Sequence, residues 1–175
     1  MMNKGFVLWF SGADDADRAM VAEAVEESLL ERGLDVELLH YDWLLAEFGA
    51  NTPEHLPRRA ALIANLLARN GVVALVAVKA PLRRDREQAR AMIGPFLEAY
   101  LPCPVCAQTS PDADFEPPTK AEIELDRETL SCEDRRRKAL LTLEVLGWIP
   151  GGQGGEYSGG EEEEIKKRLK DLGYL

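Results

Sequence analysis

Apolar runs and apolar helical stripes alternate along most of the chain. Continuous apolar residues at 6–10 and 72–78 predict strands that are buried on both faces, as in a parallel sheet covered by helices. Apolar residues spaced three and four apart predict helices over 18–32 and 56–67. The remaining elements are short strands at 35–39, 96–101 and 121–126, and helices at 84–93 and 131–147, the last opened by a Ser131–Asp134 capping box. This alternation predicts an α/β fold, a three-layer parallel sheet with helices on both faces.

The composition changes after Pro150, where a glycine-rich stretch precedes a charged segment. In residues 161–175, Ile165, Leu169 and Leu172 recur at helical spacing. The chain is therefore divided into a domain at 1–149 and a Gly-rich linker with a short amphipathic helix at 150–175. Two interpretations of that helix stay open: it docks on its own domain, or it binds an unknown protein partner or another copy of the chain.

The charge balance narrows the classes of ligand. With 31 acidic and 21 basic side chains, the net charge is −10 and the pI is about 4.8. Nucleic-acid binding depends on clustered Lys and Arg, so a nucleic-acid partner is not expected. A polyanion such as ATP would need a local positive pocket. No apolar run is long enough for a membrane helix and no signal-peptide pattern is present, so a cytoplasmic protein without a membrane partner is expected.

Several segments together resemble the adenylylsulfate kinase family, P-loop kinases that phosphorylate adenosine 5′-phosphosulfate with MgATP in sulfate assimilation. The matching segments are 5–12, 31–39, 71–78, 81–90, 96–100 and 115–118, so the resemblance covers nearly all of residues 4–149. It implies a P-loop NTPase-type sheet with the strand order 2-3-1-4-5. It also implies that a homodimer is a natural assembly for this chain.

The phosphate-binding loop departs from the P-loop pattern of Gly, four residues, then Gly-Lys-Ser/Thr. Only Gly12 is retained: Asp17 replaces the second glycine, Arg18 replaces the lysine, and Ala19 replaces the magnesium-binding hydroxyl. Asp14 and Asp15 add two carboxylates, and each like-charge pair with a triphosphate would cost about 4 kcal/mol at about 4 Å and an effective dielectric near 20. The three aspartates could hold a divalent cation, or they are a solvated loop favoured at a helix N-terminus.

The substrate side implied by the resemblance is also incomplete. Where the family has Asp-Gly-Asp-Asn-x-x-Arg, this chain retains one carboxylate, Asp42, as a weak catalytic remnant. Arg58 and Arg59 match the paired arginines of the family, and Lys79 and Pro81 flank an alanine where the family has serine. The other changes are Pro53 and Leu56 at an arginine and an asparagine position, and a short loop at 103–114 where the family has a basic lid.

Other clusters suggest different chemistry. Cys103 and Cys106 form a C-x-x-C that suits zinc or a redox dithiol, or they are two loop cysteines without a special role. The other candidate zinc ligands are Cys132, His40 and His55. Trp43 and Phe48 beside Asp42 line a ligand pocket or pack in the core, and Arg135–Arg136–Arg137–Lys138 is interpreted as the solvated face of a helix.

These observations favour a catalytically degenerate adenylylsulfate kinase relative, a binding or regulatory module for which no cofactor is expected. The alternative is an active ATP-dependent phosphotransferase that uses MgATP, with Arg18 and Asp42 in an unusual site. A second alternative is a metal or redox module built on the cysteines.

Overall fold

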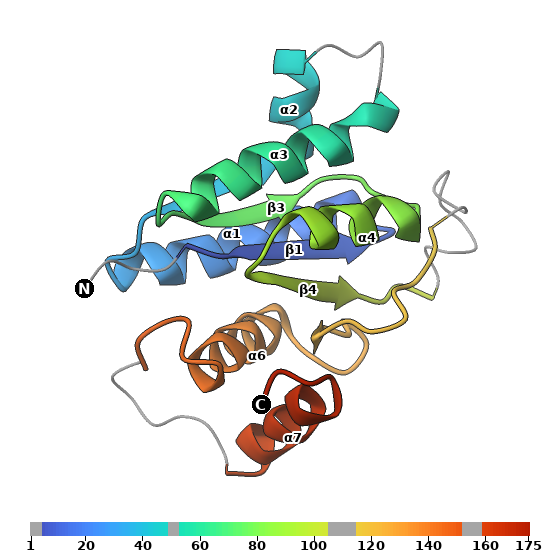
Figure 1. Ribbon diagram of the computed structural model, residues 1–175. Coiled ribbons are helices and arrows are strands. Elements are labelled where there is room, and N and C mark those ends of the chain that lie inside the picture. The colour runs from blue at the N-terminus through green and yellow to red at the C-terminus, as the bar shows by residue number, and fades with distance from the viewer. Residues whose placement is uncertain (1–4, 49–52, 105–114, 152–158) are drawn as a thin grey trace.

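The computed structural model shows a five-stranded parallel sheet with the strand order β2-β3-β1-β4-β5, which confirms the predicted α/β class and strand order. It describes residues 5–48, 53–104, 115–151 and 159–175 (Figure 1). The strands are β1 (Val7–Gly12), β2 (Val36–His40), β3 (Val73–Ala77), β4 (Phe96–Leu101) and β5 (Ile123–Glu124). The helices are α1 (Asp15–Glu31), α2 (Tyr41–Phe48), α3 (Leu56–Arg69), α4 (Arg83–Met92), α6 (Cys132–Val145) and α7 (Gly159–Asp171), and a short 3-10 helix spans Pro53–His55.

Two apolar cores, one on each face of the sheet, explain why β1 is apolar along its whole length. Leu8 and Phe10 point into the core formed with α1 and α6, whereas Val7 and Trp9 point into the core formed with α3 and α4. Because successive strand residues face opposite sides, a strand covered on both sides needs apolar residues at every position. The packing of α3 and α4 over β1 and β3 is visible in Figure 1.

The element boundaries differ from the predicted ones at three places. Helix α1 begins at Asp15, three residues before the expected start, because the side chain of Asp14 accepts a hydrogen bond from the Asp17 amide and caps the helix there. Helix α2 falls in a segment for which no helix was predicted. Strand β5 has two residues rather than the six expected, whereas the capping box at Ser131 and Asp134 is confirmed.

The C-terminal helix α7 packs on α6. Ile165 and Leu169 are buried beside Leu141 of α6 in a small apolar cluster of their own. The Arg168 guanidinium donates hydrogen bonds to the Ala121 carbonyl, at 2.8 and 3.1 Å. These are the contacts expected if the helix docks on its own domain. The apolar face that a partner would use is covered by α6.

Replacing Leu169 with alanine is expected to lower the free energy of unfolding by at least about 2 kcal/mol, because truncating a fully buried leucine leaves a cavity. Urea denaturation followed by circular dichroism measures this change. Lys167→Gln, an exposed change on the same helix, is the control and should leave the midpoint unchanged. An unaltered unfolding curve for Leu169→Ala would instead show that α7 is available to a partner.

None of the helices in the described ranges combines the length and the apolar character needed to cross a bilayer.

Candidate functional site

The candidate site lies at the carboxyl end of β1, where residues 12–18 lead into α1. Gly12, the one retained P-loop glycine, has a structural reason to be glycine: a Cβ there would lie 2.7 Å from the carbonyl oxygen of Leu101 on the neighbouring strand β4. Glycine is therefore required by the close approach of two strands, whether or not a phosphate binds. Its retention does not by itself indicate a phosphate site.

The N-terminus of α1 is capped by a carboxylate of the chain itself. Asp14 accepts a hydrogen bond from the Asp17 amide at 3.1 Å and pairs with Arg127 at 2.8 Å. Partial burial opposes ionisation, but the Asp17 amide and the Arg127 guanidinium outweigh it and lower the pKa of Asp14. In a working P-loop, backbone amides of this region point at phosphate oxygens. Here the Asp17 amide is already occupied by an ionised carboxylate.

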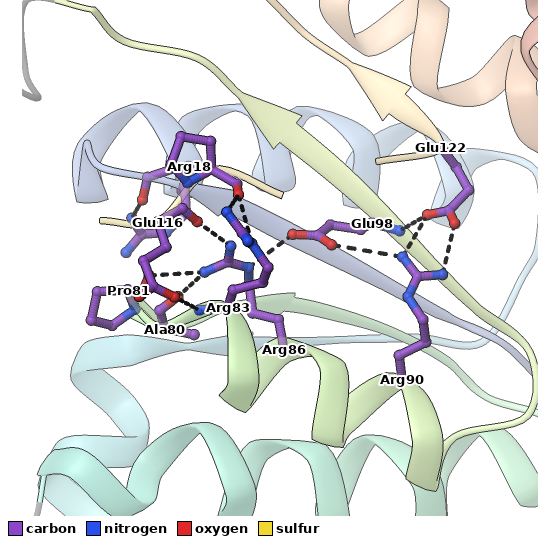
Figure 2. Close-up of polar contacts among 11 residues, drawn as sticks. Arg18, Ala80, Pro81, Arg83, Arg86, Arg90, Glu98, Glu116 and Glu122 are labelled. Atoms are coloured by element: carbon purple, nitrogen blue, oxygen red, sulfur yellow. Dashed lines mark hydrogen bonds and ion pairs between the residues drawn. The ribbon is translucent and has the colours of Figure 1, made fainter. Parts of the chain in front are cut away.

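Arg18, at the position of the P-loop lysine, is folded back onto the loop. Its Nη1 donates to the Gly12 carbonyl at 2.5 Å, and its Nη2 donates to the Asp15 carboxylate (Figure 2 shows the Arg18 side chain). The side chain is only 2% exposed. A lysine that serves a nucleotide must reach the outer phosphates, whereas this guanidinium is fixed by two groups of its own loop.

Asp17 is part of a buried ion pair with α6. Both of its carboxylate oxygens lie 2.8 Å from Nη1 of Arg135, and the two side chains are 7% and 5% exposed. The interpretation of Arg135 as part of a solvated helix face is therefore wrong. The hydrophobic pattern of α6 missed it because a long guanidinium can be buried wherever a carboxylate partner meets it.

The remaining substrate-side residues are not joined to this loop. Asp42 lies exposed in the first turn of α2, and Arg58 is exposed on α3. Within the described residues, no hydrogen bond or ion pair connects either of them to residues 12–18. Arg59 instead packs over the ring of Phe48, 5.4 Å from its centroid.

The aromatic residues of α2 and the residues that follow β3 were the other predicted parts of the substrate side. Trp43 and Phe48 are 48% and 42% exposed, so neither is a core residue. The carbonyl of Pro81 accepts a hydrogen bond from Arg86 at 3.1 Å, and Lys79 makes a contact of its own while lying half-buried after β3. These contacts tie Pro81 to α4 rather than to a vacant substrate site.

The sequence analysis missed a buried charge network that fixes α4 to β4 (Figure 2). Arg86 Nε donates to Glu98 at 2.9 Å, and its Nη1 donates to the Ala80 carbonyl at 2.6 Å. Arg90 forms a two-pronged pair with Glu122, at 2.7 and 2.9 Å. Burial lowers the pKa of Arg86, and the Glu98 carboxylate opposes that shift. A glutamate inside an otherwise apolar strand was the signal that could have revealed this network.

Tyr174, which follows α7, joins the same network. Its hydroxyl donates to Glu122 at 2.8 Å and accepts from Arg90 at 3.1 Å. Burial and the hydrogen bond to the Glu122 carboxylate raise the pKa of Tyr174 to about 12. The hydroxyl therefore stays protonated, and remains a donor to Glu122, near neutral pH.

The cysteines do not form a zinc site with the described residues. Cys103 is disulfide-bonded, Cys132 is a free and half-buried thiol, and Cys106 lies outside the described residues. Across residues 5–48, 53–104, 115–151 and 159–175, no group of three His, Cys, Asp or Glu side chains could hold a metal ion. This applies equally to Asp14, Asp15 and Asp17.

A parallel sheet of order 2-3-1-4-5, with the loop after β1 leading into the longest helix, defines the class of P-loop α/β proteins. Residues 4–116 match the family model for adenylylsulphate kinase. The chain belongs to the adenylylsulphate kinase family.

Relatives and solved structures agree with this assignment. The chain is 29% identical to the adenylyl-sulfate kinase of Rippkaea orientalis, with 85% of this chain and 97% of that protein covered. It is similar to the hexameric APS kinase from Thiobacillus denitrificans, with a TM-score of 0.74 and 25% identity over 86% of this chain, which spans 31% of that chain. It is also similar to the APS kinase of Mycobacterium tuberculosis in complex with AMPPNP and APS, with a TM-score of 0.68 and 26% identity over 81% of this chain and 98% of that one.

Proposed function

We propose that this chain is a catalytically degenerate member of the adenylylsulfate kinase family that acts by binding, as a partner-interaction or ligand-sensing module. The observation that carries the proposal is the internal position of Arg18, whose guanidinium is held by the Gly12 carbonyl and the Asp15 carboxylate. The cation that should meet the phosphates is thereby neutralised within the loop.

The rest of the loop supports the same proposal. Ala19 has no hydroxyl to ligate magnesium, and the acidic loop would repel a triphosphate. Phosphoryl transfer depends almost entirely on positioning and on positive charge around the phosphates. Asp42 is exposed, and in the described part of the chain no hydrogen bond or ion pair joins it to Arg18. On this proposal the protein needs no cofactor, and MgATP is not its ligand.

An active ATP-dependent kinase is the rival proposal. Its support is that relatives matched over nearly their whole length are named adenylyl-sulfate kinases. For this activity Arg18 would have to leave the Gly12 carbonyl and the Asp15 carboxylate and turn toward a bound MgATP. Asp42 would then supply the single carboxylate of the substrate side.

Calorimetric titration of the full chain with MgATP, and separately with adenosine 5′-phosphosulfate, is expected to give no binding heat up to a ligand concentration of about 1 mM. Any binding free energy would then be weaker than about −4 kcal/mol. A discontinuous assay for phosphorylated product is expected to show no turnover. The Rippkaea orientalis relative, named an adenylyl-sulfate kinase, is the positive control in both measurements. Micromolar binding or measurable turnover by this chain would decide for the active kinase.

We also propose that the chain forms a homodimer. A hexameric member among the similar structures supports self-association, and α3 exposes Leu62 and Leu66 one turn apart, at 54% and 50%. Sedimentation velocity is expected to show a species of twice 19.4 kDa, and Leu62→Gln with Leu66→Gln is expected to convert it to the monomer. Leu30→Gln, an equally exposed leucine on α1, is the control. A monomer at high micromolar concentration would refute the dimer.

A cytoplasmic location stays a prediction.

A further inference from the structure

A polar cavity lies against α4, and none of residues 12–18 of the β1–α1 loop lines it. It has a volume of about 290 Å³ and is lined by residues of α4, by Glu98 of β4, by residues 118–120 and Glu122, and by Leu172 and Tyr174 after α7. We call it the α4–α7 pocket. Small-molecule sites usually measure about 300–1,000 Å³, so this pocket suits a compact ligand.

The buried floor of the pocket is electrically balanced. Glu98 and Glu122 are 5% and 4% exposed, and each is bound by an arginine of α4. The carboxylates of this floor compensate Arg86 and Arg90, and they are held too tightly by these guanidinium groups to bind a ligand cation. The floor is therefore a rigid support, and the rim determines which ligand binds.

Two cations of the rim, Arg83 and Lys120, form no ion pair with a carboxylate of the described residues. The Arg83 guanidinium donates Nε and Nη2 to the Pro117 carbonyl, at 3.0 and 2.9 Å, and the Arg83 backbone amide donates to the Glu116 carboxylate at 2.8 Å. Lys120 is exposed, and in the described part of the chain it has neither a hydrogen bond nor an ion pair. Glu87 is the one exposed carboxylate of the lining. With Glu87 counted, Arg83 and Lys120 leave one excess positive charge on the rim, in a protein whose net charge is −10.

We propose that the α4–α7 pocket binds a compact tetrahedral dianion, a phosphate or sulfate group, through Arg83, Lys120 and the Thr119 hydroxyl. Two cations and a hydroxyl donor suit such a group, because a guanidinium and an ammonium form short, charge-assisted hydrogen bonds with its oxygens. The excess of local positive charge is what a small anion needs in an acidic protein.

Occupancy of this pocket is coupled to the docking of α7. Leu172 and Tyr174 form part of the wall, and the Tyr174 hydroxyl is bonded to Glu122 and Arg90 in the floor. A ligand that binds only the complete pocket stabilises the docked C-terminal segment by mass action. This extends the ligand-sensing part of the proposed function, but it does not depend on the state of the β1–α1 loop.

Titration of the full chain with inorganic phosphate and with inorganic sulfate, in chloride buffer, is expected to give saturable 1:1 binding by calorimetry. Lys120→Gln is expected to weaken binding roughly tenfold, because a charge-assisted hydrogen bond is lost. Glu87→Gln is expected to tighten it several-fold by removing a like charge. Lys167→Gln, an exposed lysine outside the pocket, should leave the affinity unchanged. The phosphate arm and the sulfate arm show which oxyanion is preferred.

Hydrogen exchange supplies a second readout. Saturating phosphate or sulfate is expected to slow amide exchange in residues 165–174, and in Lys120→Gln this protection should be lost at the same anion concentration. Because Lys120 is exposed, the urea unfolding midpoint of Lys120→Gln should match that of the unchanged protein. Absence of saturable binding, equal losses in Lys120→Gln and Lys167→Gln, or equally tight binding of malonate would overturn the proposal.

The two proposals fail separately. If MgATP binds and phosphate binding still depends on Lys120, the degenerate-kinase proposal fails and the pocket proposal stands. If MgATP does not bind and phosphate binding is insensitive to Lys120→Gln, the pocket proposal fails and the degenerate-kinase proposal stands. A third outcome is that MgATP competes with phosphate, and does so equally in the unchanged chain and in Lys120→Gln. This outcome would place the anion at the β1–α1 loop and refute the pocket proposal.

Discussion

Replacing Arg86 with methionine is expected to lower the free energy of unfolding by about 3–5 kcal/mol, because it removes the close partner of the buried Glu98 carboxylate and leaves only the longer 3.6 Å contact with Arg90. Arg86 is 1% exposed and pairs with Glu98, which is itself 5% exposed. The substitution also leaves the carbonyls of Ala80 and Glu116 without the guanidinium donor, whereas the Pro81 carbonyl keeps its hydrogen bond from the Glu116 amide. These carbonyls belong to the segments that follow β3 and precede β5, so the loss affects the connection of α4 to both.

Urea denaturation monitored by circular dichroism measures this effect. Arg84→Met is the matched control, since Arg84 is the same residue type on the same helix with a 75% exposed side chain. Its free energy of unfolding should change by less than about 0.5 kcal/mol, as is usual for surface substitutions. Similar midpoints for the two variants would show that the Arg86 network contributes little. Adding Glu98→Leu to Arg86→Met should recover part of the loss, because the uncompensated carboxylate is then removed as well.

Restoring the P-loop glycine by Asp17→Gly is expected to destabilise the protein by about 3–5 kcal/mol, because it leaves Arg135 buried and without its carboxylate. Asp17 joins the start of α1 to α6 through two contacts of 2.8 Å. Glycine in the first turn of α1 adds a smaller loss of about 0.5–1 kcal/mol. A change toward the kinase pattern therefore weakens the fold.

The control for Asp17→Gly is Asp15→Gly, which removes an exposed carboxylate from the same turn. Its cost should be much smaller, although it frees one end of the Arg18 guanidinium. Thermal and urea unfolding measure both variants, and calorimetry with MgATP tests whether either gains nucleotide binding. If Asp17→Gly were as stable as the unchanged protein and bound MgATP, the aspartate would be a recent surface change and not a structural residue.

Much of the fold could be predicted from local patterns, since each pattern reports a burial that neighbouring residues share. The uninterrupted apolar run of β1 predicted a central strand, and the Ser131–Asp134 spacing predicted the start of α6. Helix α2 was missed, because its exposed Trp43 and Phe48 hide the helical alternation. The start of α1 was placed too late, because its cap depends on the conformation of Asp14.

The candidate site could be predicted only in part. Counting the lost glycine, lysine and hydroxyl positions indicates from the sequence that the loop is unlike a P-loop. It does not indicate where the replacement side chains point. Asp17 was expected to face a ligand with Asp14 and Asp15, whereas it is bound to Arg135 on another helix. Charged side chains are long, so their partners depend on which elements pack together.

By itself, the sequence determined the α/β class, the strand order implied by its resemblance, the family, and the loss of the phosphate-binding residue types. These follow from periodicity and from residue identity, which are local properties. The tertiary structure decided the rest. It paired Asp17 with an arginine 118 residues away, turned Arg18 onto Gly12, and docked Tyr174 against Glu122. A buried ion pair requires two segments to meet at one point in a medium of low dielectric, and only the packed chain brings them there.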